Sequence, residues 1–228
     1  MRFLGNCLGI LFFVPIQMQS IQLKLIQGES QTVEFKFELN SARRIAATLS
    51  AFANTDGGTL LVGVKDNGSV AGIRLEEELY VLDAAATIYC NPPIELENRR
   101  HDIQGKMVLE SVVKPAVSKP VLAETEPGNW KAWVRYGASN RLASLIHLEL
   151  WRMNENNHRP SVYSTKEQKL ISAFNDKKWL TLNQAVRFSK MPRHEVVRTL
   201  ASFVRWNIAE MVPEEAGGFV FGMIEENF

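Results

Sequence analysis

A cluster of basic side chains lies near the end of the chain, in a segment that is predicted to form a helix. Residues 165–207 carry nine Lys and Arg against three Asp and Glu, although the whole chain has a net charge of only +1. The segment RHEVVRTLASFVRW, residues 193–206, has apolar residues at helical spacing, so a helix there projects Arg193, His194 and Arg198 away from its apolar face. Two more basic residues precede this helix, Arg187 and Lys190. Such side chains bind phosphates and base edges, which predicts contact with a nucleic acid. The alternative is a protein-binding module whose basic residues only keep it soluble.

Five more basic residues lie earlier in the chain, where they could bind phosphates. Lys36, Arg43 and Arg44 cluster near the start of a predicted helix, where cations oppose the helix dipole. Arg135 and Arg141 bracket a Gly-Ala-Ser-Asn turn and could clamp a backbone phosphate between them. The alternative for both groups is that these residues lie on the solvent-exposed surface and bind no ligand.

Several other kinds of site are excluded by composition and motif. Two cysteines, Cys7 and Cys90, cannot build a disulfide framework, and the four histidines show no zinc-site spacing. No G-x-x-x-x-G-K-[ST] segment is present, so a P-loop mechanism has no support. The apolar fraction of 46% and the charged fraction of 22% exclude disordered and fibrous classes. The cysteine usage indicates a reducing compartment, and we expect a cytoplasmic protein.

The first predicted elements are a strand, a helix and a second strand. Residues 32–38, TVEFKFE, alternate as in a half-buried strand, with Glu34 on the polar side. A helix is expected over 42–54 because its apolar residues recur at helical spacing. Two glycines then lead into an apolar strand over 59–64, and an Asp-Asn-Gly turn leads into a further strand over 69–73.

The middle of the chain mixes helices and strands. Further elements are expected as a helix over 75–89, strands over 94–103, 106–114, 121–124 and 131–136, and a helix over 142–154. Because helices accompany a largely antiparallel sheet, the fold class of residues 18–153 is α+β.

A different pattern follows a polar stretch at residues 154–164, which is the best linker candidate. After it, a Ser-Thr-Lys-Glu capping box opens a helix, and a short extended piece, two helices and a hairpin over 208–223 follow. Three helices followed by a β-hairpin is the order of a winged helix-turn-helix domain. We therefore predict such a domain over residues 165–228.

Residues 1–17 form a separate segment with one Arg and an apolar run. The run is shorter than the ~20 residues that a membrane-spanning helix needs. It resembles the apolar region of a signal peptide, but no small-x-small cleavage site follows. We expect a leader, or sequence upstream of a true start at Met18, and no membrane partner; an export or anchor signal is the alternative.

A longer pattern resembles the AlbA-like domain of the Schlafen family. The family pattern begins with an acidic residue followed by Glu-Phe-Lys, here Glu29 and the segment 34–36. A helix ending in Ala-Phe-Ala-Asn-Thr and two glycines follows over 51–58, then an apolar strand that closes on Gly-Val-x-Asp over 63–66. The segment VRYGASNR over 134–141 resembles the family's closing Arg-x-Gly-Ser-Ser-Asn motif. The combination is specific and covers roughly residues 22–145.

The resemblance has two competing implications. Animal Schlafen proteins use this domain as a metal-dependent ribonuclease on structured RNA such as transfer RNA, and their three carboxylates match Glu29, Glu34 and Asp66 by position. These side chains would hold Mg²⁺ or Mn²⁺, which take oxygen ligands. Bacterial relatives with an added winged helix are instead mostly described as DNA-binding transcriptional regulators.

Strand geometry raises an objection to the metal site. Glu29 and Glu34 are an odd number of positions apart, so one regular strand would place them on opposite faces. They converge only if the backbone bends at Gly28 before the strand begins. The alternative is an exposed Glu34 and an Asp66 that only supports its turn.

Three hypotheses follow for the function. The first is a non-catalytic nucleic-acid-binding protein, specifically a DNA-binding transcriptional regulator without a cofactor. The second is a Mg²⁺- or Mn²⁺-dependent endonuclease that acts on RNA through the three carboxylates. The third is a protein-interaction module that forms a homodimer through the 208–223 hairpin. The choice between DNA and RNA stays open.

Overall fold

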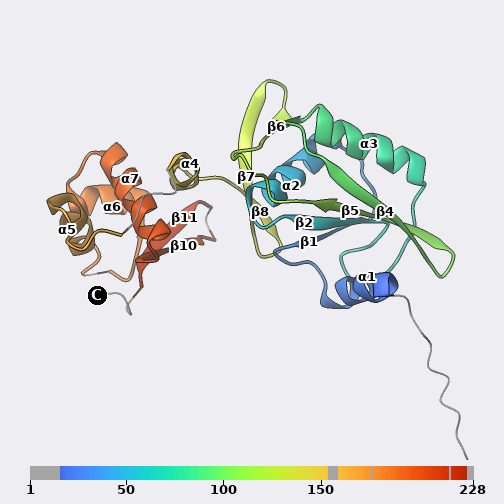
Figure 1. Cartoon of the computed structure of the whole chain (residues 1–228), viewed down its shortest axis with the longest axis horizontal. Helices are drawn as coiled ribbons and strands as arrows, with labels where there is room; N and C mark the ends of the chain where they lie inside the picture. The colour runs from blue at the N-terminus through green and yellow to red at the C-terminus, as the bar shows by residue number, and fades with distance from the viewer. Residues whose placement is uncertain (1–15, 154–158, 176, 216, 225–228) are drawn as a thin grey trace, which may run out of the picture.

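The structure is a computed structural model that describes residues 16–153, 159–175, 177–215 and 217–224. It has an N-terminal part, residues 16–142, and a C-terminal part, residues 159–224, with one helix between them (Figure 1). Most of the predicted leader, residues 1–17, and the first half of the predicted linker, residues 154–164, lie outside the described residues.

A four-stranded sheet forms the centre of the N-terminal part. Its strands lie in the spatial order β1 (Val33–Lys36), β2 (Gly58–Val62), β5 (Lys106–Val113) and β4 (Leu96–Ile103). β1 and β2 are parallel, with Val33 opposite Thr59, because helix α2 (Ala42–Asn54) carries the chain back between them. The other two pairs are antiparallel.

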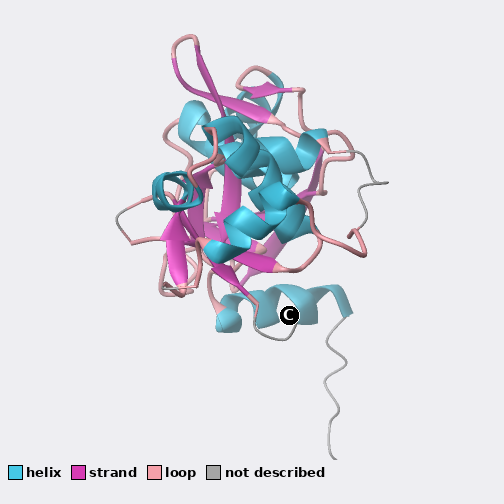
Figure 2. Ribbon diagram, turned by 90° about the vertical axis from the view of Figure 1, so that its left-hand side faces the viewer, coloured by secondary structure: helices cyan, strands magenta, loops and turns pink. Residues whose placement is uncertain are grey.

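Helices cover both faces of this sheet. α2 and α3 (Leu75–Thr87) cover one face, where Phe52 packs with Leu60 in a buried cluster. α1 (Ile16–Gln27) covers the opposite face, where Leu61 is buried, and it lies below the sheet in Figures 1 and 2. Successive strand residues point to opposite faces, so neighbouring residues of β2 supply the two cores.

A buried carboxylate ties α1 to the sheet. Lys24 Nζ of α1 lies 2.6 Å from Glu110 Oε1 and 3.1 Å from Thr59 Oγ1. His101 Nε2 lies 2.8 Å from the other oxygen of Glu110. Since Glu110 is only 1% exposed, its charge needs these partners to be tolerated in the interior.

A second four-stranded sheet packs against α2. Its strands lie in the order β3 (Cys90–Asn91), β6 (Leu122–Glu126), β7 (Asn129–Tyr136) and β8 (Ser139–Leu142). The last residue of α2, Asn54, holds this sheet in place. Its amide donates to the carbonyls of Val121 (2.8 Å) and Trp133 (2.9 Å), and its Oδ1 accepts from Val121 N (2.8 Å).

The rest of the chain forms helices and a small sheet. The elements are α4 (Leu145–Arg152), α5 (Thr165–Ser172), β9 (Trp179–Thr181), α6 (Leu182–Ser189), α7 (Arg193–Arg205), β10 (Ala209–Pro213) and β11 (Phe219–Met223). The strand order is β10-β11-β9. Ser164 and Thr181 start α5 and α6 with capping boxes, which satisfy the free backbone N–H groups of the first turn. No helix in the described ranges is long and apolar enough to cross a membrane.

One hydrophobic cluster spans the junction of the two parts. Val134 of β7 and Ile146 of α4 are buried in the same cluster as Leu200 of α7 and Phe221 of β11. Arg141 of β8 also donates a hydrogen bond across the junction, to a backbone carbonyl of the C-terminal part. The two parts are therefore joined by packing as well as by the chain.

The mixed α+β character is confirmed, and three local predictions differ from the structure. β8 forms where a polar turn was predicted, because residues 137–138 make a two-residue hairpin loop, and α4 begins at Leu145 rather than at residue 142. The predicted strand over 69–73 is reduced to one bridge between Val64 and Val70, and it is interrupted at Gly72 with φ 87°. The central sheet also contains one parallel pair, which was not predicted.

Candidate functional site

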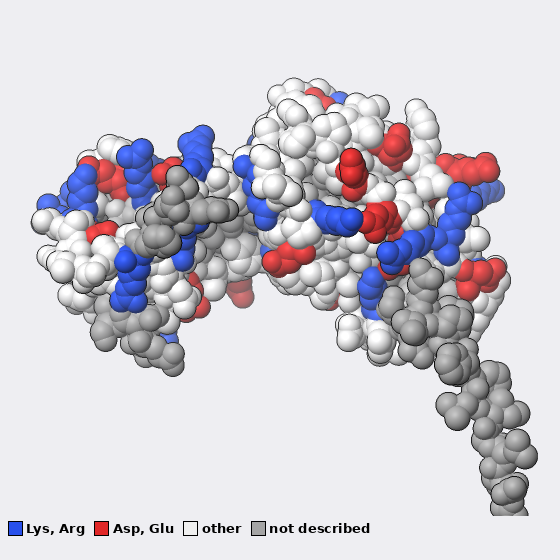
Figure 3. All heavy atoms as spheres, viewed as in Figure 1, with Lys and Arg blue, Asp and Glu red and all other residues white. Residues whose placement is uncertain are grey.

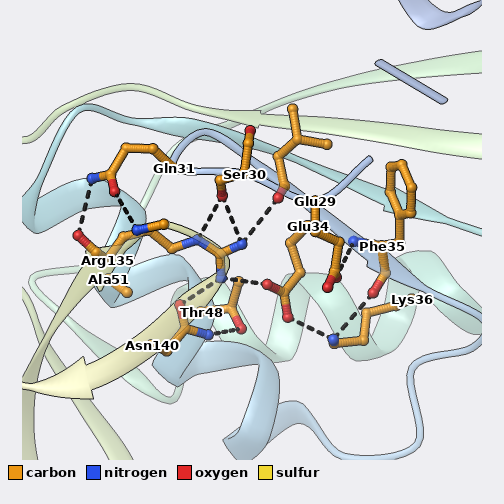
Figure 4. Close-up of polar contacts among 12 residues, drawn as sticks. Glu29, Ser30, Gln31, Glu34, Phe35, Lys36, Thr48, Ala51, Arg135 and Asn140 are labelled. Carbon is orange, nitrogen blue, oxygen red and sulfur yellow. Dashed lines mark hydrogen bonds and ion pairs between the residues drawn. The ribbon is translucent and has the colours of Figure 1, made fainter. Parts of the chain in front are cut away.

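Arg135 lies at the centre of a buried polar cluster (Figure 4). It belongs to β7, is 1% exposed, and its guanidinium uses all five of its N–H groups. These donate to the carbonyls of Ser30 and Val33, to Asn140 Oδ1 at 2.9 Å and to the Glu34 carboxylate. The prediction that Arg135 contacts a phosphate is therefore wrong. Because its guanidinium is buried and all of its N–H groups are bonded, Arg135 links β7 to the start of β1.

Glu34 is held between two cations. One carboxylate oxygen pairs with Arg135, and Lys36 Nζ lies 2.5 Å from the other (Figure 4). Glu34 is 6% exposed because the polar side of β1 faces α2 and β7 rather than solvent. The alternative of an exposed Glu34 face is thus wrong, and both oxygens are already engaged by protein groups.

Of the other two predicted carboxylates, Glu29 lies beside Glu34 in the same polar cluster (Figure 4), whereas Asp66 belongs to the turn after β2. Glu29 Oε1 accepts a hydrogen bond from Phe35 N at 2.9 Å, which folds the segment before β1 back onto the strand. Asp66 is exposed in the turn after β2, where it has no hydrogen-bond partner among the described residues. Across the described ranges, no group of three or more His, Cys, Asp or Glu is arranged to hold a metal ion. Glu29, Glu34 and Asp66 in this arrangement therefore do not fit Mg²⁺ or Mn²⁺, and their catalytic role stays a prediction.

Lys36, Arg43 and Arg44, the basic cluster predicted near the start of α2, differ in their exposure and in their partners. Lys36 is committed to Glu34, and Arg43 forms an ion pair of 2.7 Å with Glu124 while its guanidinium stacks over Tyr89 at 4.5 Å. These two side chains hold α2 and β1 in place. Arg44 is exposed, and its side chain forms no hydrogen bond or ion pair within the described ranges, so it is the member of this cluster that can reach a phosphate.

The glycine pair before β2 closes a turn against the protein itself. Gly57 has φ 75°, and a Cβ there would lie 2.7 Å from the carbonyl oxygen of Val113. A Cβ on Gly58 would lie 2.3 Å from the ring of Phe52. Both positions need glycine for close packing, which explains the pair without a bound phosphate.

Arg141 lies at the junction of the two parts rather than on a free turn. Its Nη1 donates to the backbone carbonyl of Glu214 at 3.0 Å, and its Nε is buried without a hydrogen-bond partner in the described ranges. It does not form a pair with the buried Arg135, so the predicted two-arginine phosphate clamp is not assembled.

The predicted basic residues of the C-terminal part are all exposed. Val196, Leu200 and Phe203 are buried on the inner side of α7, and the basic set lies outside, namely Arg187, Lys190, Arg193, His194 and Arg198. Lys190 ends α6 in the left-handed conformation, with φ 54°, and so turns the chain into α7. Figure 3 shows several separate Lys and Arg side chains on the visible face of the C-terminal part, with some Asp and Glu among them.

α4 adds residues to this surface that sequence reasoning missed. A groove of about 630 Å³ between α4 and α7 is lined by Arg152 and Glu149 from α4 and by Arg193, His194 and Arg198 from α7. Arg198 Nε lies 3.5 Å from Glu149 Oε1, although the Arg198 side chain stays 76% exposed. No local pattern connects α4 with α7, so only the tertiary packing reveals that Arg152 joins the basic set.

The chain was compared with solved structures, with curated proteins and with models of protein families. The similar solved structures include the DIP2311 protein from Corynebacterium diphtheriae (TM-score 0.47, 16% identity, 91% of this chain and 38% of that chain). They also include the N-terminal domain of a RecG-related protein from Nitrosomonas europaea (TM-score 0.39, 23% identity, 62% of this chain and 97% of that chain). The chain thus spans well under half of the first of these. No curated protein matches. The family model described as Schlafen, AlbA_2 matches residues 29–144, just over half of the chain, and this chain therefore belongs to that family.

Proposed function

We propose that this protein is a DNA-binding transcriptional regulator. In this proposal, residues 18–153 form the Schlafen AlbA-like domain and residues 165–228 form a winged helix-turn-helix domain that contacts DNA. The family is generally related to nucleic acids, which supports the class of ligand. The finer assignment depends on the surface of α6 and α7.

The observation that carries the proposal is the division of α7 into two sides. Val196, Leu200 and Phe203 are buried, while Arg193 and Arg198 project outward from the first half of the helix. A recognition helix in a helix-turn-helix domain presents its N-terminal residues to the major groove in this way. The turn from α6 supplies further cations for the flanking phosphates.

The AlbA-like domain contributes less charge to this surface. Arg135, Lys36 and Arg43 are committed to internal ion pairs, so Arg44 is the cation of the predicted N-terminal set that stays available. Arg152 of α4 lies beside α7 and extends its basic surface. We therefore expect the C-terminal part to provide most of the binding free energy.

Binding of this kind depends strongly on salt. Neutralising a phosphate releases bound counterions, and about five basic contacts give a slope of about −4.5 for log K against log salt. The test is fluorescence anisotropy of the full chain with duplex DNA, single-stranded DNA and transfer RNA at about 50 mM and about 200 mM salt. We expect the tightest binding with duplex DNA; no binding to any of the three would contradict the proposal.

The same samples distinguish the regulator from the nuclease. With Mn²⁺ present, a regulator leaves all three nucleic acids intact, and EDTA changes nothing. Cleavage of transfer RNA that EDTA stops, and that Glu34→Gln abolishes, would replace this proposal with the metal-dependent nuclease.

Oligomeric state is a further part of the prediction. β11 lies between β10 and β9, so β10 is an edge strand that could pair with a second copy. The mass from size-exclusion chromatography with light scattering tests the predicted homodimer.

A further inference from the structure

A cavity of about 710 Å³ lies where the two parts meet. Residues of β8 and the start of α4 line one side, and residues of α6, the start of α7 and the β10–β11 hairpin line the other. Its volume is in the range of small-molecule sites, which occur preferentially at the interfaces between domains. The cavity shares Arg193 with the outward face of α7 that carries the proposed function, and the other basic residues of that face lie outside its lining.

Two N–H groups of the residues that line this cavity have no acceptor among the described residues. Arg141 Nε and Trp133 Nε1 are both buried without a hydrogen-bond partner in the described ranges, and both residues line the cavity. A buried N–H group left unpaired costs about 1–3 kcal/mol, so each favours a ligand that supplies an acceptor. Two such donors in one cavity are a signal that packing alone does not explain.

Two guanidinium groups add positive charge that the protein does not neutralise. Arg141 donates to a backbone carbonyl, and Arg193 Nη1 donates to Asn183 Oδ1 at 2.6 Å. Neither Arg141 nor Arg193 forms an ion pair within the described ranges. Glu214 supplies the single acidic side chain in the lining, so the arginines outnumber it.

Helix dipoles increase the positive potential. α4, α6 and α7 each begin at a lining residue, namely Leu145, Leu182 and Arg193. The N-terminus of a helix carries a partial positive charge, so three of them at one cavity favour an anion.

The remaining lining is apolar. Leu142 and Leu145, which are 45% and 47% exposed, line the cavity together with Phe219. A ligand that fits must therefore join an apolar body to an anionic group.

We propose that this cavity binds a small organic anion, with a flat apolar body between the leucines and an acidic oxygen group at Arg141, Trp133 and Arg193. Because both parts of the chain line the cavity, the ligand would hold them together. The proposal does not depend on nucleic-acid binding, and its test contains no nucleic acid.

The test uses two probes that differ only in charge. The full chain is titrated with 1-anilinonaphthalene-8-sulfonate and, separately, with N-phenyl-1-naphthylamine, which lacks the sulfonate. We expect saturable binding of the anion and about tenfold weaker binding of the neutral probe, since a charge-assisted hydrogen bond contributes roughly that factor.

Matched variants locate the site. Arg141→Gln and Arg193→Gln should each weaken the anion about tenfold, while Arg100→Gln, an exposed arginine outside the cavity, should change nothing. Glu214→Gln should strengthen the binding of the anionic probe, because it removes a negative charge from the lining.

The Arg141 variant needs a folding control, because Arg141 also donates to the Glu214 carbonyl. Near-ultraviolet circular dichroism provides that control. If Arg141→Gln unfolds, the exposed Arg193 still gives a valid test. Equal binding of both probes, or unchanged binding in Arg193→Gln, would overturn the proposal.

Discussion

Arg135 and Arg198 show how one residue type serves opposite purposes in the two parts of the molecule. Arg135 is 1% exposed and donates five hydrogen bonds inside the AlbA-like domain, whereas the Arg198 side chain is 76% exposed and has one long ion pair with Glu149. The first arginine cannot leave its partners without exposing a buried carboxylate. The second can exchange Glu149 for a phosphate at little cost, because a surface pair contributes little stability.

This difference separates stability from binding. Removing the buried arginine should damage the fold, and removing the exposed one should damage only the affinity for nucleic acid. Variants at buried and at exposed positions should therefore change different quantities.

The largest effect is expected for Arg135→Leu. Removing one partner of a buried ion pair leaves Glu34 incompletely neutralised and the carbonyl of Ser30 without its donors, which costs about 3–5 kcal/mol. Urea unfolding followed by circular dichroism measures this loss. Arg44→Leu is the control, with an expected change within about 0.5 kcal/mol. A variant that keeps its stability but loses nucleic-acid binding would show that Arg135 contacts phosphate.

The junction between the two parts should be sensitive to acid through His147. Burial lowers the pKa of His147 from 6.5 to about 4, and its Nδ1 accepts from Ser144 N at 3.1 Å. The unfolded chain therefore binds the proton more tightly than the folded chain does. The contribution of His147 to the free energy of unfolding is fully present above about pH 6.5, and about 3 kcal/mol of it is lost as the pH drops toward 4.

His147→Gln isolates this contribution. Glutamine keeps a side chain that can complete the capping box of α4 but does not titrate, so the difference in unfolding free energy between wild type and variant should change across that pH window. Parallel curves between pH 7 and pH 4 would show that His147 is not the titrating group.

A smaller effect is expected from the exposed arginines. Arg198→Gln and Arg187→Gln should each weaken DNA binding about tenfold and reduce the salt slope by about 1, with unchanged unfolding free energy. Arg100→Gln, on β4 of the other part, is the matched control. Fluorescence anisotropy gives both quantities, and equal losses in all three variants would mean that the charge acts without a defined interface.

The smallest effect should come from Glu149→Gln. This carboxylate lies beside α7 and pairs with Arg198, so it competes with phosphate for that side chain. Its removal should tighten DNA binding by about two- to threefold, in proportion to the low strength of a surface pair. Weaker binding in this variant would indicate that Glu149 positions Arg198 instead.

Local signals explain which elements could be predicted from the sequence. The capping box at Ser164 and the neighbouring strands predicted over 94–103 and 106–114, here β4 and β5, depend on residues close in the chain, and both are confirmed. The helix α1 was not predicted, because Ile21, Leu23 and Leu25 alternate with polar residues in a manner that resembles a strand.

The burial of charged side chains could not be predicted from the sequence. The polar side of β1 alternates as if it faced solvent, yet Glu34 lies under α2 beside Arg135, which is 101 residues away in the chain. Strand periodicity says which residues share a side but not what covers that side. The same limit applies to Arg152, whose position beside α7 follows from long-range packing.

Hydrogen–deuterium exchange of the full chain, with and without duplex DNA, tests the central claim most directly. We predict slower exchange on DNA binding in peptides that cover residues 187–198, where backbone N–H groups begin α7, and no change in peptides that cover residues 29–36 around the Arg135 cluster. Protection of residues 29–36 with unchanged exchange in residues 187–198 would contradict it, and would place the nucleic acid at the buried carboxylates instead.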